Sequence, residues 1–104
     1  MKILITGGCG FVGSNVALKL DPEHEVHCLD NLSKSESKLN EGLLQKRDIP
    51  VVKGSISDKK FVDDLIKDLK PDCLIHLAAQ VAMTDSIEDP HNDFNINFVG
   101  TFNL

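Results

Sequence analysis

Short apolar runs alternate with amphipathic stretches along most of the chain. The apolar runs predict strands at residues 2–6, 25–29, 50–53 and 73–77. Helical spacing predicts helices at residues 11–20 and 35–47, and a third that begins behind Ser57-Asp58 and stops before Pro71. The apolar stripes of these helices are Val12, Val16 and Leu20; Leu39, Leu43 and Leu44; and Phe61, Val62, Leu65, Ile66 and Leu69.

This alternation of strands and helices predicts the α/β fold class. Strand–helix–strand units with right-handed crossovers make a parallel sheet with helices on both faces. Continuous apolar strands suit such a sheet, because both of its faces are covered. We therefore expect a Rossmann-type doubly wound parallel sheet, incomplete, with about four strands and flanking helices.

The last part of the chain is predicted to be one helix. Its pattern begins at Asp89-Pro90 and runs to Leu104, with Phe94, Phe98 and Phe102 on one stripe that we expect to pack in the core. No strand follows residues 73–77, so an apolar edge or face would stay uncovered. Either the last helix covers that edge in a small natural domain, or the domain is truncated at its C-terminal end. We expect the second.

Residues 6–14 join the first predicted strand to the first helix through a glycine-rich turn. Gly8, Gly10 and Gly13 match G-x-G-x-x-G, and Gly7, Gly10 and Gly13 match a wider spacing. Gly7 or Gly8 supplies the tight turn, Gly10 lets the backbone approach a pyrophosphate, and Gly13 lets the helix pack closely. The helix N-terminus then offers N–H groups to the phosphates.

Asp30 lies at the end of the second predicted strand, 17 positions after Gly13. A carboxylate there accepts hydrogen bonds from the adenosine ribose hydroxyls of a dinucleotide and repels a 2′-phosphate. We therefore predict that residues 1–104 form an NAD-binding Rossmann domain. Lys34 is close enough in sequence to keep NADP open, and a solvated Asp30 beside a purely structural turn is the other alternative.

Composition excludes several classes of partner. The formal net charge is −5, and no basic cluster is longer than two residues, as at Lys46-Arg47, which argues against binding nucleic acid. No apolar stretch is long enough to span a membrane, and the N-terminus lacks the pattern of a secretory signal. The three cysteines have no CxxC or metal-ligand spacing, so we expect reduced thiols, no metal and a cytoplasmic location.

Four blocks of sequence resemble a known family. They are residues 6–14, 30–33, 76–80 and 97–104, and together they extend over the whole chain. In order and spacing they are similar to the extended short-chain dehydrogenase/reductase family, in particular its NAD-dependent nucleotide-sugar epimerases and dehydratases. Within that family, residues 80–86 look most like the CDP-paratose (CDP-tyvelose) 2-epimerases.

The resemblance implies a set of cofactor contacts, in which the glycine turn lines the pyrophosphate and Asp30 holds the adenosine ribose. Residues 77–79 would pass under the nicotinamide-side ribose, and Asn97 would point from the last helix towards the cofactor-binding strands. Thr84 and Ser86 would face the substrate. The implied cofactor-binding residues are Gly7, Gly10, Phe11, Val12, Gly13, Asp30, Asn31, Ser33, Ser55, Ile56, Leu77, Ala78, Ala79 and Asn97.

Two departures from the family pattern limit what the resemblance implies. The family commonly places Gly-Asp-hydrophobic after the third strand, whereas this chain has Gly54-Ser55-Ile56, so the adenine contact is weaker or is made elsewhere. We expect the nearby Asp58 to cap a helix instead. The family also uses a Tyr-x-x-x-Lys pair, in which lysine lowers the pKa of the acid/base tyrosine. This chain contains no tyrosine.

The predicted function is therefore the NAD-binding N-terminal part of a nucleotide-sugar epimerase similar to the CDP-paratose 2-epimerases, with the catalytic half absent. Whether the chain is itself an enzyme stays open. The alternatives are part of a nucleotide-sugar 4,6-dehydratase and a non-catalytic NAD-binding module. The resemblance also implies a nucleotide-sugar substrate for the complete enzyme and a homodimer through the C-terminal helix.

Two further residues carry competing interpretations. His76 could be a catalytic base, but a core histidine bonded to backbone is the interpretation that we favour. Cys9 lies near a helix N-terminus, which could lower the pKa of its thiol. A small residue tolerated in a variable loop is the preferred alternative.

Overall fold

The computed structural model of the chain describes residues 1–79 and 87–104, and its centre is a parallel sheet. Within those residues four strands pair in the order β3-β2-β1-β4, and every pair is parallel. The strands are β1 (Lys2–Thr6), β2 (Glu25–Asp30), β3 (Val51–Lys53) and β4 (Cys73–His76). The predicted Rossmann-type α/β fold is confirmed.

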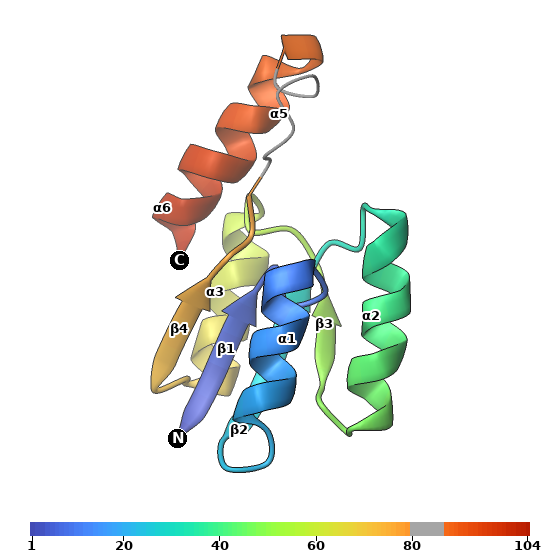
Figure 1. Ribbon diagram of the computed structural model, residues 1–104. Helices are drawn as coiled ribbons and strands as arrows, with labels where there is room; N and C mark the ends of the chain where they lie inside the picture. Colours follow the sequence, from blue (N-terminus) through green and yellow to red (C-terminus); the bar gives the residue numbers. More distant parts are fainter. Residues whose placement is uncertain (80–86) are drawn as a thin grey trace.

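Helices cover both faces of this sheet, as Figure 1 shows. Helices α1 (Phe11–Leu20) and α2 (Ser35–Lys46) lie on one face, and α3 (Lys59–Leu69) lies on the other. Asp58 begins α3 as its N-cap, and its side chain accepts a hydrogen bond from Phe61 N, as expected. The doubly wound arrangement follows from right-handed crossovers between parallel strands.

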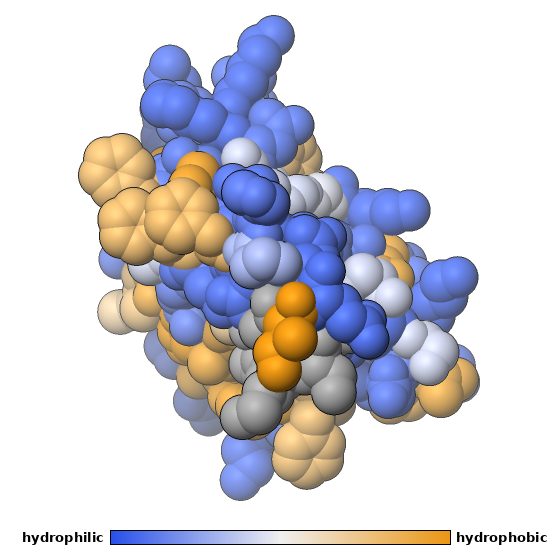
Figure 2. Space-filling model, turned by 90° about the horizontal axis from the view of Figure 1, so that it is seen from above, coloured by the Kyte–Doolittle hydropathy of each residue, from blue (hydrophilic) through white to orange (hydrophobic). Residues whose placement is uncertain are grey.

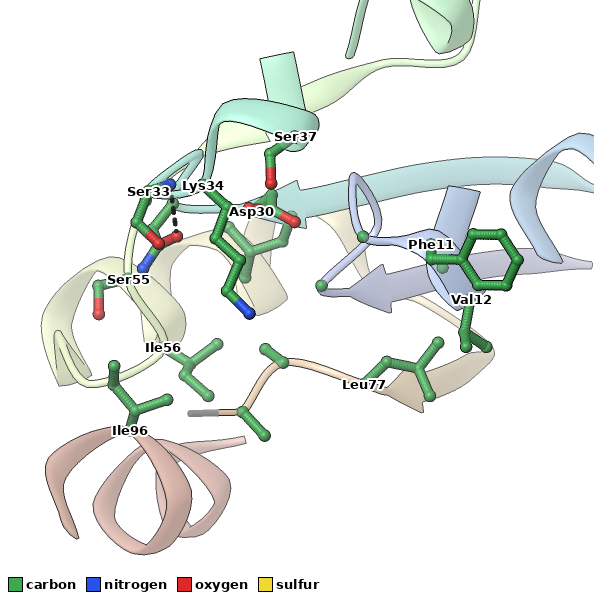
Figure 3. A pocket seen from close by; sticks show the side chains of 18 residues that line it. Phe11, Val12, Asp30, Ser33, Lys34, Ser37, Ser55, Ile56, Leu77 and Ile96 are labelled. Carbon is green, nitrogen blue, oxygen red and sulfur yellow. Dashed lines mark hydrogen bonds between the residues drawn. The ribbon is translucent and has the colours of Figure 1, made fainter. Parts of the chain in front are cut away.

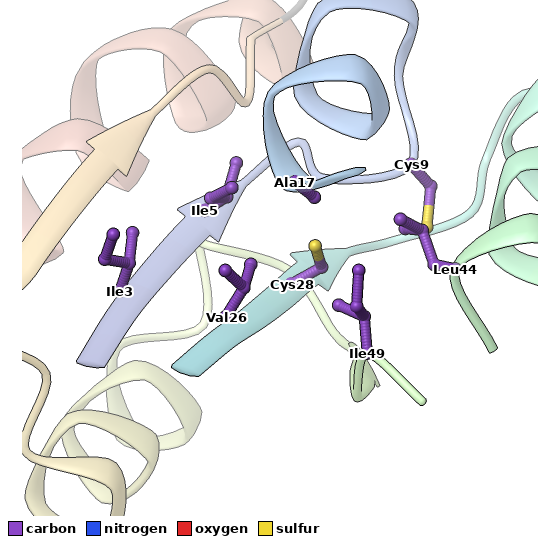
Figure 4. Close-up of a cluster of buried hydrophobic side chains, with 8 residues drawn as sticks. All are labelled: Ile3, Ile5, Cys9, Ala17, Val26, Cys28, Leu44 and Ile49. Atoms are coloured by element: carbon purple, nitrogen blue, oxygen red, sulfur yellow. The ribbon is translucent and has the colours of Figure 1, made fainter. Parts of the chain in front are cut away.

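The core is divided by the sheet into two clusters of buried side chains. Alternate residues of one strand point to opposite faces, so Ile3 and Ile5 contribute to one cluster and Leu4 to the other. The cluster under α1 and α2 is drawn in Figure 4 and consists of Ile3, Ile5, Cys9, Ala17, Val26, Cys28, Leu44 and Ile49. The cluster under α3 consists of Leu4, Leu29, Ile56 and Val62.

The inward faces of α1 and α2 differ from the predicted apolar stripes. Leu39 is 75% exposed and Leu43 is 50% exposed, so the predicted stripe of α2 is correct only at Leu44. Besides Leu44, the buried residue of α2 is Ser37. The Asn40 side chain also points inwards and donates a hydrogen bond to Cys9 O at 2.8 Å.

On α1 the buried residues are small, which lets this helix lie close to the sheet. They are Gly13, Ser14 and Ala17. Of the predicted stripe, Val16 and Leu20 are partly buried and pack against the core, whereas Val12 is 56% exposed. The hydrophobic periodicity therefore located α1 and part of its inward side, but not the small residues that lie deepest.

The C-terminal helix is continuous but not uniform, and it rises from the carboxyl edge of the sheet (Figure 1). It consists of α5 (Pro90–Phe94), a π-helical segment η1 (Asn95–Gly100) and α6 (Thr101–Asn103). Gly100 is buried against Ile56, since an added Cβ would lie 2.5 Å from Ile56 Cγ1. Asn103 Nδ2 donates to Ile56 O at 3.0 Å, so this helix is fastened to the loop after β3.

The aromatic stripe of this helix is exposed, so the prediction that it packs in the core is wrong. Phe94 and Phe98 stack with their ring centroids 5.1 Å apart, and they are 55% and 62% exposed. Phe102, one turn further on, is 81% exposed. Figure 2, which views the molecule from above, shows hydrophobic side chains in exposed groups on an otherwise largely hydrophilic face.

Candidate functional site

A cavity of about 290 Å³ opens at the carboxyl ends of the strands. The strand order places it where successive strands run to opposite sides of β1, which is the position at which open α/β sheets bind ligands. Figure 3 shows side chains from the glycine turn, the ends of β2 and β4, the loop after β3 and the C-terminal helix around it. Its lining is Gly7, Gly10, Phe11, Val12, Gly13, Leu29, Asp30, Asn31, Ser33, Lys34, Ser37, Gly54, Ser55, Ile56, Leu77, Ala78, Ala79 and Ile96.

The glycine turn is packed so tightly that side chains are excluded at three positions, Gly7, Gly8 and Gly13. At Gly8 an added Cβ would lie 2.4 Å from Cys28 Cβ. Gly7 has a φ of +69°, which favours glycine, and an added Cβ would lie 2.9 Å from Ala78 N. Gly7 is therefore the residue that makes the turn. At Gly13 a Cβ would lie 2.2 Å from Gly7 O, so the first turn of α1 packs directly on the preceding backbone.

The N-terminus of α1 borders the cavity. Its N-cap is Gly10, which has no side chain to bond the N–H groups of the first turn. Phe11 and Val12 follow, and both line the cavity while their side chains are largely exposed. The free N–H groups and the helix dipole together make a site that attracts an anion without a lysine or arginine in the turn.

Asp30 presents a buried carboxylate at the end of β2. The residue is only 9% exposed, and its two oxygens accept hydrogen bonds from Cys9 N at 3.0 Å and Leu32 N at 2.9 Å. Asp30 therefore organises the loops on both sides of the cavity, and it is not the solvated residue that the structural alternative required. Each carboxylate oxygen has a second lone pair, so both can also accept a hydrogen bond from a ligand hydroxyl.

Polar groups beside Asp30 surround the same end of the cavity. Asn31 Oδ1 accepts from Ser33 N at 3.0 Å, which shapes the start of the loop that leads to α2. Ser55 Oγ lies 2.7 Å from Ser57 Oγ, so its hydroxyl is already engaged within its own loop. Lys34 extends its ammonium group into the cavity (Figure 3) and brings a positive charge near Asp30.

The opposite wall is formed by residues 77–79 after β4. Leu77 N donates to Thr6 O at 3.0 Å, so this segment continues the ladder between β1 and β4 for one more residue. Ala78 and Ala79 carry only methyl groups, so the backbone forms much of this wall. A flat ligand can therefore lie close to it.

All of the predicted cofactor residues except Asn97 line this one cavity. The Asn97 side chain donates instead to Asp93 Oδ1 at 3.2 Å, and the preceding residue, Ile96, contributes to the lining. Thr84 and Ser86, predicted to face the substrate, lie outside the described residues.

Five of the lining residues were not among the predicted cofactor contacts, although Lys34 was considered as a partner for a 2′-phosphate. These are Leu29, Lys34, Ser37, Gly54 and Ile96. Leu29 and Gly54 adjoin predicted residues, so their neighbours were a usable signal. Ser37 and Ile96 gave no signal, because each depends on which side of its helix faces the cavity.

The surroundings of Cys9 exclude a reactive thiol. Cys9 is fully buried, and burial together with the nearby Asp30 carboxylate raises the pKa of its thiol to about 12. The suggestion that the helix N-terminus lowers this pKa is therefore wrong. His76 also differs from expectation, since it bonds the hydroxyl groups of Thr6 and Thr101 and not the backbone.

The fold and site define the class of this protein as a Rossmann-type α/β domain with a glycine turn at the carboxyl edge of a parallel sheet. The chain belongs to the GDP-mannose 4,6 dehydratase family, whose model matches residues 4–104. This confirms the resemblance to nucleotide-sugar epimerases and dehydratases. No helix among the described residues is long and apolar enough to cross a membrane.

Relatives with known structures or curated names agree with this membership. The chain is 46% identical to a CDP-paratose 2-epimerase of Salmonella typhi, and the match covers all of this chain and 31% of the relative. It is 32% identical to a dTDP-glucose 4,6-dehydratase of Mycobacterium tuberculosis, and this match covers 100% of this chain and 31% of the relative. A UDP-glucose 4-epimerase of Thermus thermophilus in complex with NAD superimposes with a TM-score of 0.81 at 36% identity, covering 100% of this chain and 32% of that one. The chain thus spans about a third of the length of these relatives.

Proposed function

We propose that this chain binds NAD and is the cofactor-binding part of a nucleotide-sugar epimerase. The observation that carries the proposal is that the glycine turn, Asp30 and the wall at residues 77–79 line one and the same cavity. These residues come from separate parts of the sequence and meet only in the folded chain. The NAD complex of the similar epimerase from Thermus thermophilus supports the same cofactor.

The groups around the cavity fit the parts of a dinucleotide. The α1 N-terminus fits the charge of a pyrophosphate, and its N-cap Gly10 has no side chain to keep the backbone away from the phosphates. Asp30 would accept hydrogen bonds from the adenosine ribose, and Ile56 would contact the adenine. Ala78 and Ala79 would lie beside the nicotinamide half.

When bound, NAD supplies the redox chemistry, in which a hydride is removed from a sugar carbon and returned to the opposite face. The residues of this chain bind and orient the cofactor for that step. The chain has no tyrosine, so the acid/base role of the family's tyrosine is not assigned to it.

Among nucleotide sugars, we favour a CDP-sugar and 2-epimerisation for the complete enzyme. The support is the 46% identity with the CDP-paratose 2-epimerase of Salmonella typhi, compared with 32% for the 4,6-dehydratase of Mycobacterium tuberculosis. A 4,6-dehydratase and a non-catalytic NAD-binding module are the competing functions. Assays of epimerisation with CDP-sugars and of dehydration with dTDP-sugars, both on the full-length gene product, distinguish the three functions.

Calorimetric titration of the chain with NAD⁺ and NADP⁺ tests the cofactor assignment. We expect NAD⁺ to bind at least about tenfold more tightly, because the Asp30 carboxylate repels a 2′-phosphate, and tenfold corresponds to about 1.4 kcal/mol. Asp30→Asn removes the negative charge and keeps one acceptor oxygen. It should therefore weaken NAD⁺ binding by about 1.5 kcal/mol and reduce the preference for NAD⁺ over NADP⁺.

Lys34→Ala is the matched control for the alternative cofactor. If Lys34 binds a 2′-phosphate, this substitution lowers the affinity for NADP⁺ and leaves the affinity for NAD⁺ unchanged. Tighter binding of NADP⁺ than NAD⁺ by the wild-type chain would contradict the proposal.

We also propose that the complete protein is a homodimer that pairs through the C-terminal helix of this chain, residues 90–103. The exposed aromatic stripe of Phe94, Phe98 and Phe102 supports this, since an apolar stripe on a helix surface is typical of an interface. Phe98→Glu should shift the assembly to monomer in sedimentation velocity, whereas Leu39→Glu, at an exposed leucine of α2, should not.

The free thiols of Cys9, Cys28 and Cys73 support the cytoplasmic location that we infer.

A further inference from the structure

His76 connects three elements at the carboxyl edge of the sheet. It ends β4, and its Nδ1 lies 2.6 Å from Thr6 Oγ1 at the end of β1. Its Nε2 lies 2.8 Å from Thr101 Oγ1 on α6. One imidazole ring thus bridges the sheet and the C-terminal helix.

The hydroxyl of Thr6 fixes the role of Nδ1. Thr6 is fully buried, and its Oγ1 accepts a hydrogen bond from Ala78 N at 3.2 Å. Thr6 Oγ1 also accepts from Leu77 N at 3.1 Å, and this N–H is shared with Thr6 O. A hydroxyl oxygen has two lone pairs and one hydrogen. Because both lone pairs are engaged, the hydroxyl hydrogen is the group left for His76, so Thr6 donates and Nδ1 accepts.

The hydroxyl of Thr101 fixes the role of Nε2 in the same way. Thr101 Oγ1 donates its hydrogen to Asn97 O at 2.8 Å, one turn earlier in the helix. It can therefore meet His76 Nε2 only as an acceptor, which requires a hydrogen on Nε2. Both ends of the bridge independently require the neutral imidazole with its hydrogen on Nε2. Burial lowers the pKa of His76, which favours the same neutral form.

This bridge reaches two walls of the cavity. Leu77 and Ala78, whose amides bond Thr6 Oγ1, form the wall that follows β4. Thr101 belongs to the helix that contributes Ile96 to the lining. The position of one wall relative to the other therefore depends on groups that His76 holds together.

We propose that His76 is a positioning residue for the cofactor site: it joins the Thr6 hydroxyl to the Thr101 hydroxyl and thereby sets residues 77–79 against the C-terminal helix. This role rests on the proposed NAD site. It requires the ring to be a neutral donor at Nε2 and an acceptor at Nδ1, so a side chain that merely fills the same volume does not replace it.

Three variants of the chain separate positioning from packing. His76→Leu fills the space without either hydrogen bond and should weaken NAD⁺ binding about tenfold, while His76→Asn keeps an acceptor for Thr6 and should stay within about threefold of wild type. His27→Leu, at a histidine that does not line the cavity, is the control and should bind like wild type. Equal NAD⁺ affinity of His76→Leu and wild type would overturn the role.

A second readout needs no cofactor. The ring ¹⁵N shifts of His76 should show a hydrogen on Nε2 and none on Nδ1, and amide exchange of Ala78 should be faster in His76→Leu than in wild type. A hydrogen on Nδ1, or unchanged exchange at Ala78, overturns the bridge itself. If the wild-type chain shows the expected ring shifts but does not bind NAD⁺, the proposed function is refuted. The role of His76 in a cofactor site is then refuted too, although the bridge itself stands.

If His76→Leu does not fold, Thr101→Val carries the test. This substitution removes the Nε2 partner from an exposed position and leaves the core unchanged. It should weaken NAD⁺ binding about threefold and speed amide exchange at Ala78, since losing one neutral hydrogen bond has about this effect. Wild-type values for both would overturn the proposal.

Discussion

Two helical glycines of this chain should respond in opposite ways to the same substitution. Gly13 lies in the first turn of α1, and an added Cβ there would lie 2.2 Å from Gly7 O and 2.9 Å from Gly8 Cα. Both neighbours are backbone atoms of the turn, so neither can rotate away. Gly42 lies within α2, and an added Cβ there would meet nothing within 4 Å.

The magnitudes follow from these two surroundings. Alanine gains about 1 kcal/mol over glycine inside a helix. At Gly42 nothing opposes this gain, so Gly42→Ala should stabilise the fold by about 0.5–1 kcal/mol. At Gly13 the turn must move away from the methyl group, and overpacking of this kind costs about 3 kcal/mol. The strain exceeds the gain in helix propensity, and Gly13→Ala should destabilise the fold by about 2 kcal/mol.

Urea denaturation of both variants and wild type, monitored by circular dichroism, measures the two changes. Gly13→Ala should also weaken NAD⁺ binding, because the displaced turn lines the cavity. Unchanged or increased stability of Gly13→Ala would refute the close packing of α1 on the turn. Destabilisation by Gly42→Ala would show that the helix-propensity reasoning fails in this chain.

Asp30 and the buried thiols give two further predictions. Asp30→Ala leaves the N–H groups of Cys9 and Leu32 without their carboxylate, so it should destabilise the fold by about 2–4 kcal/mol in urea denaturation; a loss below about 0.5 kcal/mol would contradict the bonding at Asp30. Burial raises the pKa of the Cys9 and Cys28 thiols to about 12, so below that pH both stay protonated. Iodoacetamide at about pH 8 should therefore spare them in the folded chain, relative to the half-buried Cys73, and label all three in urea; rapid labelling of folded Cys9 would contradict this.

The sequence was sufficient to predict the sheet and most of the cavity. Strand and helix ranges followed from apolar periodicity, and the alternation of strands and helices in turn predicted that the strands are parallel. The cavity followed because the carboxyl ends of parallel strands share one edge, which brings Gly10, Asp30 and Ala78 together.

What could not be predicted concerns the sides of helices. The inward face of α2 carries Ser37 and Asn40, polar residues that a hydrophobic pattern does not detect, and the Asn40 side chain donates to Cys9 O. On the C-terminal helix, the family resemblance implied Asn97, whereas Ile96 lines the cavity and the Asn97 side chain donates to Asp93 within the helix. Sequence blocks alone do not show which of two neighbouring helical residues faces a cavity.

Binding of NAD⁺ at the carboxyl edge of the sheet is the central claim, and an NMR titration of the ¹⁵N-labelled chain tests it most directly. Saturable shift changes should concentrate on the amides of Gly10, Val12, Asp30 and Ala78, which line the cavity. The amide of Glu25, at the amino end of β2, should not move. The absence of saturable changes, or changes centred on the amino ends of the strands, would contradict the account.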